Sequence, residues 1–309
     1  MASPESRRIR ATFVNNQQTI ETPIEAQRQE WEAAVAATNL QLKAVVAPVD
    51  LDRIYGEWVT VHDSAAAGVV LFLHGGGYTS GSCKTHRALA AHMARAAHTR
   101  VLLIDYRLAP EHPCPAAIDD AVYAYRWLLQ QGIAPQQIVL GGDSAGGGLA
   151  LAALVALRDS GTAVPAAAFL LSPWLDLALH GESLHTRAQL DPLTSYNDLR
   201  QAATLYLGNL TPDDPRASPL YADLHRLPAL LVHVGDHEVL LSDATRLAEK
   251  AHAAGVPVQL EIWDTMWHVW HAWADELPEA RAAITQIGEF IRRRLNEAIC
   301  SPSCSLSTS

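Results

Sequence analysis

Short apolar runs and helix-like stretches alternate along most of this chain, and the alternation limits the folds open to it. The apolar runs are nearly continuous, which suits strands that are buried on both faces. They lie at residues 69–73, 101–104, 138–140, 167–171, 230–234 and 258–262. Helix-like stretches separate them at residues 86–97, 116–131, 145–160, 243–254 and 278–298. This order predicts an α/β fold with a mostly parallel, doubly wound sheet.

Two stretches depart from this rhythm and divide the chain. Residues 24–46 have helical composition without strand alternation, so we expect a helix outside the main body, whereas residues 55–62 alternate like a strand. Residues 181–227 contain no buried strand, and we expect an insertion that pairs with the N-terminal helix as a cap over one edge of the sheet. The predicted parts are cap helices at 1–46, an α/β core at 47–180 and 228–298, the cap insertion at 181–227 and a disordered tail at 299–309.

The charge balance disfavours nucleic acid and anionic lipid as partners. Of the 309 residues, 23 are Lys or Arg and 33 are Asp or Glu, which gives a formal net charge of −10. Binding to either polyanion depends on Lys and Arg that neutralise phosphate. No apolar run approaches the length of a membrane span, and residues 1–22 lack the apolar core of a secretory signal. We therefore expect a cytoplasmic protein with no membrane span and no nucleic-acid partner.

The four cysteines give no sign of a metal site. Cys83 and Cys114 stand alone, and Cys300 and Cys304 lie in the Ser-rich tail. The sequence has no CxxC pair and no Cys/His cluster with zinc-ligand spacing. We expect free thiols and no bound metal.

A candidate nucleophile follows the apolar run at 138–140. The segment Gly-Gly-Asp-Ser-Ala-Gly-Gly at 141–147 contains the spacing Gly142-x-Ser144-x-Gly146 and leads into a helix-like stretch. Glycines two residues before and after a serine allow a sharp strand-to-helix turn that exposes the serine hydroxyl. A Gly-rich turn with an incidental serine has the same composition, but the position between a strand and a helix favours a nucleophile.

The run at 69–73 ends in a second candidate element, His-Gly-Gly-Gly-Tyr at 74–78. Successive glycines leave backbone N–H groups unobstructed, as an oxyanion hole requires. A flexible turn is the alternative interpretation of this segment. Its place upstream of the serine, at the end of its own strand, favours the oxyanion hole.

A serine nucleophile needs a histidine base, and the base needs an acid that orients it. The histidines considered for the base are His225, His233, His237, His268 and His271. His268 lies in the loop between the last strand and the last helix, where the chain order Ser, acid, His puts the base. His271 is the alternative. Nearby, Trp267, Trp270 and Trp273 are spaced as packing residues at a helix start.

Three carboxylates compete for the role of the acid. Asp236, Glu238 and Asp243 all follow the run at 230–234. Asp236 lies closest to the strand, and Asp243 has the position of a helix N-cap after Ser242. The residues alone do not select one of the three.

Together the motifs resemble those of the hormone-sensitive-lipase family of α/β-hydrolases. This is the bacterial family IV esterase group, which includes acetyl esterases and monoterpene ε-lactone hydrolases. The residues that carry the likeness are 74–78, Tyr-Arg-Leu-Ala-Pro-Glu at 106–111 with Pro-Ala-Ala at 115–117, and Gly-Asp-Ser-Ala-Gly-Gly at 142–147. They occur in the family's order. The resemblance implies the α/β-hydrolase fold, with a mostly parallel eight-stranded sheet and a helical cap.

The resemblance also implies site residues. The family's pattern after the acid strand, Gly-x-x-Asp-x-Leu-x-Asp, puts the acid at Glu238, where this chain has Glu in place of the common Asp. The family's histidine matches His268. The implied oxyanion donors are the backbone N–H groups of Gly76, Gly77 and Ala145. His74 would brace the glycine loop. Asp143, Arg107 and Glu111 also lie within the family's motifs, and they would support the loops around the site.

The function that follows from the resemblance is a serine carboxylesterase acting on short-chain acyl esters. Ser144, His268 and Glu238 would form the triad, with neither a metal nor an organic cofactor. Its partner would be a small ester or lactone, and a homodimer is consistent with the frequency of dimers among relatives. A hydrolase for cyclic esters is one alternative. A ligand-binding receptor, as in the plant gibberellin receptors, is another, although those receptors resemble the family but lack the histidine that this chain has at position 268.

Overall fold

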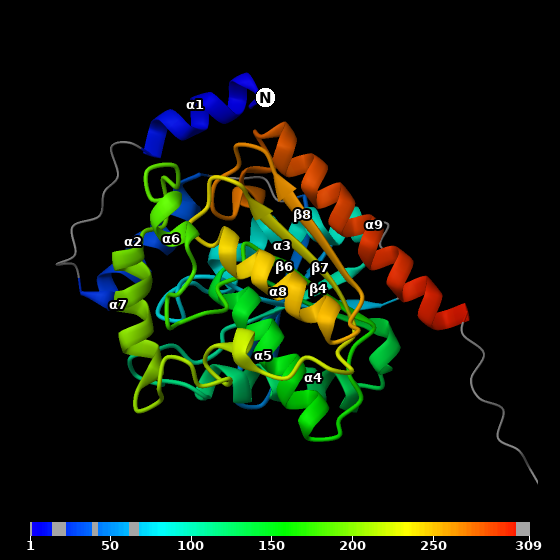
Figure 1. Ribbon diagram of the computed structural model, residues 1–309. Helices are drawn as coiled ribbons and strands as arrows, with labels where there is room; N and C mark the ends of the chain where they lie inside the picture. The colour runs from blue at the N-terminus through cyan, green and yellow to red at the C-terminus, as the bar shows by residue number, and fades with distance from the viewer. Residues whose placement is uncertain (1, 14–22, 39–42, 62–67, 301–309) are drawn as a thin grey trace, which may run out of the picture.

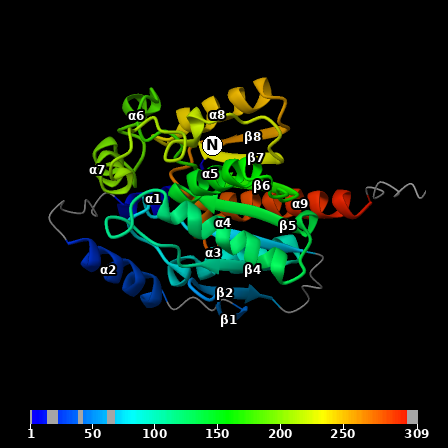
Figure 2. The same cartoon turned by 90° about the horizontal axis from the view of Figure 1, so that it is seen from below.

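The computed structural model describes residues 2–13, 23–38, 43–61 and 68–300, and an eight-stranded sheet runs through its centre (Figure 1). The strand order is β1-β2-β4-β3-β5-β6-β7-β8, so β1 and β8 form the two edges (Figure 2). The strands are β1 (Val45–Asp50), β2 (Tyr55–Thr60), β3 (Val69–Leu73), β4 (Arg100–Ile104), β5 (Ile138–Asp143), β6 (Ala167–Leu171), β7 (Ala229–Gly235) and β8 (Val258–Trp263).

The sheet is parallel from β4 to β8, and only β1 and β2 run antiparallel to their neighbours. In the centre, Leu71 pairs with Leu140, and Leu140 pairs with Ala168. β3, β5 and β6 are buried along their whole length. The predicted mostly parallel α/β sheet is therefore confirmed, and the α/β-hydrolase architecture that the motifs implied is present.

Helices cover both faces of the sheet. Side chains alternate between the faces along each strand, so Val69, Leu71 and Leu73 of β3 join one buried cluster, whereas Val70 and Phe72 join the other. Helices α4, α5 and α8 supply the first cluster, and α3 and α9 supply the second. Their bounds are α3 (Cys83–Ala97), α4 (Ala116–Gln130), α5 (Ala145–Asp159), α8 (Leu241–Ala253) and α9 (Pro278–Cys300), with a short 3-10 helix η1 (Pro135–Gln137) before β5.

Three of the remaining helices, α2, α6 and α7, lie at the left in both views, whereas α1 crosses the top of Figure 1 (Figures 1 and 2). Helix α7 lies against the glycine loop, because a Cβ added to Gly77 would be 3.2 Å from the Cβ of Ala202. Arg28 of α2 donates hydrogen bonds to the carbonyls of Thr79 and Ala109. These helices are α1 (Pro4–Phe13), α2 (Ile24–Ala37), α6 (Ser183–Thr186) and α7 (Tyr196–Leu207), and the 3-10 helix η2 (Pro219–Tyr221) follows them.

The sequence prediction for residues 24–46 is wrong at its C-terminal end. The helix α2 stops at Ala37, and Val45 and Val46 begin the edge strand β1. An edge strand need not alternate, because it is mostly exposed, and it tolerates Pro48, which cannot donate a ladder hydrogen bond. The sequence pattern of residues 45–50 therefore gives little indication of a strand. Most of the predicted tail, residues 301–309, lies outside the described residues, and α9 extends to Cys300.

The start of α5 depends on a glycine that no other residue can replace without movement of the backbone. A Cβ added to Gly146 would lie 2.1 Å from the carbonyl oxygen of Leu73 and 2.5 Å from that of His74. Both atoms belong to the main chain at the end of β3, so no side chain can move aside. The glycine allows α5 to approach β3 closely, and this approach holds residues 144–147 beside residues 74–77.

We predict that Gly146→Ala destabilises the fold and disrupts the site. Forcing α5 away from β3 should cost about 1–3 kcal/mol, or roughly 2–10 °C in Tm, as measured by thermal unfolding. The ester hydrolysis expected from the sequence should fall with it. Gly161→Ala, beyond the other end of α5, is the control, because a Cβ there has open space and meets only the strain of a positive φ. Equal activity in the two variants would contradict this prediction.

Candidate active site

Ser144 lies in a strained turn between β5 and α5. Its φ of 54° and ψ of −122° are unfavourable for a residue with a side chain, and the turn is held by its neighbours. Ser144 donates its N–H to the Leu171 carbonyl at 2.8 Å, and its own carbonyl accepts from Trp174 N at 3.0 Å. The glycines are needed here, because a Cβ on Gly142 would lie 2.2 Å from the carbonyl oxygen of Gly146. This conformation leaves the serine hydroxyl half-buried, at the start of α5.

The Ser144 hydroxyl is joined to His268 and Glu238 by two hydrogen bonds. Ser144 Oγ lies 2.9 Å from His268 Nε2, although the residues are 124 positions apart. On the other side of the ring, His268 Nδ1 lies 3.0 Å from Glu238 Oε2. A carboxylate can only accept, so Nδ1 donates to it and the neutral ring presents Nε2 as the acceptor for the serine hydroxyl. The structure thus brings together the three residues that the family resemblance implied.

The other two acid candidates face elsewhere. Asp236 Oδ1 accepts the N–H of Thr265 at 2.6 Å. Asp243 Oδ2 accepts the N–H groups of Leu175 and Asp176 at 2.7 and 3.0 Å. Its predicted N-cap position is wrong, because α8 begins at Leu241 and Asp243 lies within the first turn. Both carboxylates therefore bond to backbone N–H groups, and it is the Glu238 carboxylate that bonds to His268.

The alternative base, His271, does not reach the serine. It is fully buried in the 3-10 helix η3 (Trp270–Trp273), and its Nε2 lies 3.3 Å from His233 Nδ1. Burial lowers the pKa of His233 to about 3 and moves the pKa of His271 well below its ordinary value. The two rings are therefore neutral at physiological pH and belong to the packing beside β7. Trp267 and Trp270 are also fully buried, as their spacing predicted.

The carboxylate of Glu238 controls the charge state of His268. Burial lowers the pKa of this imidazole, but the hydrogen bond to Glu238 and the charge of that carboxylate raise it, and the net pKa is raised above its ordinary value. Glu238 itself is fully buried. A buried carboxylate next to the ring stabilises the protonated imidazole, which is the form that results when the ring takes a proton from a hydroxyl.

The glycine loop lies beside the serine and is held by two hydrogen bonds and a ring stack. Gly75 donates its N–H to Asp143 Oδ1 at 3.0 Å. His74 Nδ1 lies 2.8 Å from the Gly75 carbonyl, and its ring stacks on Tyr106 at 4.1 Å. Burial lowers the pKa of His74 to about 3, so the ring is neutral and donates from Nδ1. Gly76 and Gly77 then turn with φ values of 118° and 63°, in the positive-φ region that favours glycine.

Two residues at the site went unnoticed in the sequence. The hydroxyl of Ser172, fully buried, donates to Glu238 Oε1 at 2.7 Å. Asp191, from the insertion, accepts the N–H of Val239 at 3.0 Å. Ser172 directly follows the apolar run at 167–171, just as Ser144 follows another strand, so position alone could have marked it. Asp191 follows no strand, and nothing in its sequence neighbourhood connects it to the site.

The supporting residues expected around the site make the contacts of loop anchors. Arg107 donates to Asp120 at 2.9 Å, and Glu111 accepts from Arg28 of α2 at 2.7 Å. Cys83 and Cys114 are buried free thiols. In the described ranges, no group of three or more His, Cys, Asp and Glu residues is arranged to hold a metal ion. Within the same ranges, we find no helix with the length and apolar character that a bilayer crossing requires.

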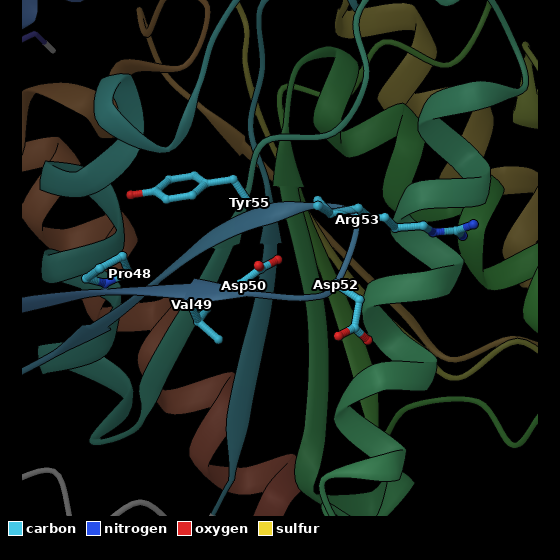
Figure 3. Close-up of a pocket in the computed structure, with 7 residues that line it drawn as sticks. Pro48, Val49, Asp50, Asp52, Arg53 and Tyr55 are labelled. Atoms are coloured by element: carbon cyan, nitrogen blue, oxygen red, sulfur yellow. The ribbon is translucent and has the colours of Figure 1, made fainter.

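One surface pocket lies away from this site. It is formed by the hairpin between β1 and β2 and is lined by Pro48, Val49, Asp50, Asp52, Arg53, Ile54 and Tyr55 (Figure 3). The guanidinium of Arg53 lies over the ring of Tyr123, 3.8 Å from its centroid. The pocket contains none of the three hydrogen-bonded residues, so it does not contribute to the candidate active site.

Comparison with known proteins agrees with this architecture. A profile of the α/β-hydrolase fold matches residues 70–272. An "Acetyl-hydrolase" of Streptomyces hygroscopicus is 44% identical over 97% of this chain and 100% of its own length. A solved esterase from the bacterial hormone-sensitive lipase family is 46% identical with a TM-score of 0.92, covering 96% of this chain and 99% of that one. The structure titled EstE5 "soaked by p-nitrophenyl butyrate" is 43% identical with a TM-score of 0.91, covering 96% of this chain and all of that one.

The chain therefore belongs to the α/β-hydrolase fold family. Within that family it is a member of the hormone-sensitive-lipase group of carboxylic-ester hydrolases, as its motifs suggested.

We predict that Glu238→Gln lowers the pKa of His268. The substitution keeps the size of the side chain but removes the charge that stabilises the imidazolium, so burial alone would then dominate. NMR titration of histidine-labelled protein measures the change. Asp236→Asn is the matched control and should leave the His268 titration unaltered, because the imidazole that Asp236 pairs with is that of His237, whose Nε2 lies 3.9 Å from Asp236 Oδ1. A response to Asp236→Asn and none to Glu238→Gln would reverse the assignment of the acid.

Proposed function

We propose that this protein hydrolyses short-chain acyl esters, with Ser144 as nucleophile, His268 as general base and Glu238 as the acid that orients the base. The observation that carries the proposal is the unbroken path from Ser144 Oγ through the His268 ring to Glu238, with separations of 2.9 and 3.0 Å. Such a path lets a base take the serine proton as the hydroxyl attacks a carbonyl carbon.

The first half-reaction transfers the acyl group to the enzyme. Ser144 Oγ attacks the ester carbonyl carbon, its proton moves to His268 Nε2, and the carbonyl oxygen becomes an oxyanion. The tetrahedral intermediate then expels the alcohol, which takes the proton from His268. The acyl group remains on Ser144 as an ester. Throughout, Glu238 keeps Nδ1 protonated and stabilises the positive ring.

The second half-reaction releases the acid. A water molecule attacks the acyl carbon and gives a proton to His268, and collapse of the second intermediate returns that proton to Ser144 Oγ. The products are the carboxylic acid and the free enzyme. Since the base must be neutral to accept a proton, activity is lost as the pH falls through the pKa of His268, which lies above its ordinary value.

The N–H groups of Gly76, Gly77 and Ala145 are the proposed oxyanion donors. Ala145 is the first residue of α5, so its N–H is among those that a helix leaves without an intrahelical partner. The helix N-terminus also favours negative charge. Removal of one such donor typically lowers kcat about 10²–10³-fold, so the glycine loop matters nearly as much as the triad.

We extend the proposal to the cap and to the substrate. The helices α1 and α2 and the insertion at 181–227 would together cover the site, which is supported by the contacts of Arg28 and of Ala202 with the glycine-loop region. Preference for short acyl groups is supported by the name acetyl-hydrolase of the Streptomyces relative and by the butyrate ester used with EstE5. A cytoplasmic location and a homodimer complete the proposal.

We predict that Ser144→Ala abolishes hydrolysis of p-nitrophenyl acetate and butyrate. The variant retains the fold but lacks the hydroxyl, so labelling by a fluorophosphonate should vanish as well. Ser160→Ala, an exposed serine beyond the end of α5, is the control and should react like the wild type. Hydrolysis by purified Ser144→Ala at the wild-type rate would remove Ser144 from the mechanism. A wild-type chain that neither hydrolyses esters nor accepts the label would favour a binding protein.

The substrate class can be tested separately with a panel of esters. We expect kcat/KM for the acetate and butyrate esters to exceed both that for the palmitate ester and that for an ε-lactone. All four substrates would react with the same serine. The ratios of their kcat/KM values therefore report the shape of the acyl site and not the chemistry. A kcat/KM for the lactone above those of the linear esters would identify the enzyme as a lactone hydrolase instead.

A further inference from the structure

The turn that follows β6 contacts two members of the proposed triad, Ser144 and Glu238, and the residue next to the third, His268. This β6 turn, residues 171–174, begins at the end of a strand that lies between β5 and β7. The Leu171 carbonyl accepts the N–H of Ser144, and Trp174 donates its N–H to the Ser144 carbonyl. The backbone of the nucleophile is therefore bonded on both sides to this one turn.

The hydroxyl of Ser172, in the same turn, bonds to Glu238 and to the residue that follows His268. It donates to Glu238 Oε1 at 2.7 Å and accepts the N–H of Val269 at 3.0 Å. A hydroxyl has one proton to donate and can also accept, so both bonds form at once. Val269 is the residue after His268, so a single oxygen atom connects the acid with the segment that carries the base.

The bond to Glu238 sets which carboxylate oxygen faces the imidazole. Oε1 is occupied by Ser172 and by the N–H of Gly235 at 2.6 Å, which leaves Oε2 for His268. Two donors on one oxygen fix the plane of the carboxylate. Without the hydroxyl, one of these donors is lost, and the Val269 N–H loses the Ser172 oxygen as its acceptor.

The backbone geometry at position 172 does not explain why this residue is a serine. The reason therefore lies in its hydroxyl. Ser172 has a φ of 47°, in the left-handed region where glycine is favoured over any residue with a side chain. Its N–H donates to the His233 carbonyl at 2.7 Å, which holds it there. Glycine would suit the turn better, yet the chain has a serine whose side chain is completely buried.

We propose that Ser172 is a positioning residue for ester hydrolysis, because its hydroxyl aligns Glu238 and the His268 segment on a turn that also holds Ser144. The inference rests on the proposed function, since it assigns a task within that triad. Ser172 is fully buried and would not touch substrate. Its loss should therefore affect kcat and leave KM unchanged.

Two substitutions separate the hydroxyl from the backbone. Ser172→Ala removes the hydroxyl and keeps the backbone strain, whereas Ser172→Gly removes both. We expect each to lower kcat for p-nitrophenyl acetate roughly 10- to 100-fold, the effect of leaving buried polar groups unsatisfied near the base. The acid limb of the kcat profile should also move to lower pH, because a less well aligned Glu238 raises the pKa of His268 less. Active-site titration with a fluorophosphonate normalises each rate to folded enzyme.

Ser218→Ala is the matched control. Ser218 is also a fully buried serine, and its hydroxyl likewise joins two groups, accepting from Leu177 N and donating to the Pro212 carbonyl, both outside the triad. The Ser218→Ala variant should have a lower Tm than the wild type but the same kcat. Wild-type kcat in Ser172→Gly, or an equal loss of kcat in Ser218→Ala, would overturn the positioning role. An active Ser144→Ala would instead overturn the proposed function, so the two failures are distinguishable.

Discussion

The parallel alignment of the central strands is the constraint on which the site depends. β3, β5, β6, β7 and β8 run in the same direction, so their carboxyl ends meet at one edge of the sheet. A slip of one residue would move a strand end by about 3.3 Å and would also exchange its two faces. Hydrogen bonds of 2.9 and 3.0 Å could not survive such a shift. Burial on both faces, which fixes the register, is therefore also what fixes the chemistry.

The close packing at that edge has a cost in free energy, which the site offsets locally. A carboxylate buried as completely as Glu238 is strongly unfavourable unless it is hydrogen-bonded or paired. Here Ser172, Gly235 and His268 all bond to it. The same bonds that compensate for its burial also direct it at the imidazole, so stability and the proposed catalysis rest on one set of contacts.

The sequence predicted those parts of the molecule that local pattern determines. Buried strands have continuous apolar runs, and a glycine-flanked serine after such a run marks the turn at Ser144. The base could be placed at His268 by its position after the last strand. The residues alone did not decide which of three carboxylates is the acid, because the composition of a loop does not show which side chain points inward. The family resemblance selected Glu238, and this is the carboxylate that the fold brings to His268.

Elsewhere the sequence failed because tertiary contacts decide the outcome. β1 is an exposed edge strand whose pairing with β2, and not its own pattern, makes it a strand. Asp243 was expected at a helix N-cap, but its carboxylate accepts backbone N–H groups of the segment after β6.

Asp191 is a second carboxylate whose role is set by a tertiary contact. Burial raises the pKa of Asp191 to about 6, so ionising it at neutral pH costs the folded protein free energy that the unfolded chain is spared. That carboxylate accepts the N–H of Val239, the residue after Glu238. The insertion is thus bonded to the acid loop at a point where any displacement of one would strain the other, and the position of the proposed cap is physically linked to the alignment of the acid.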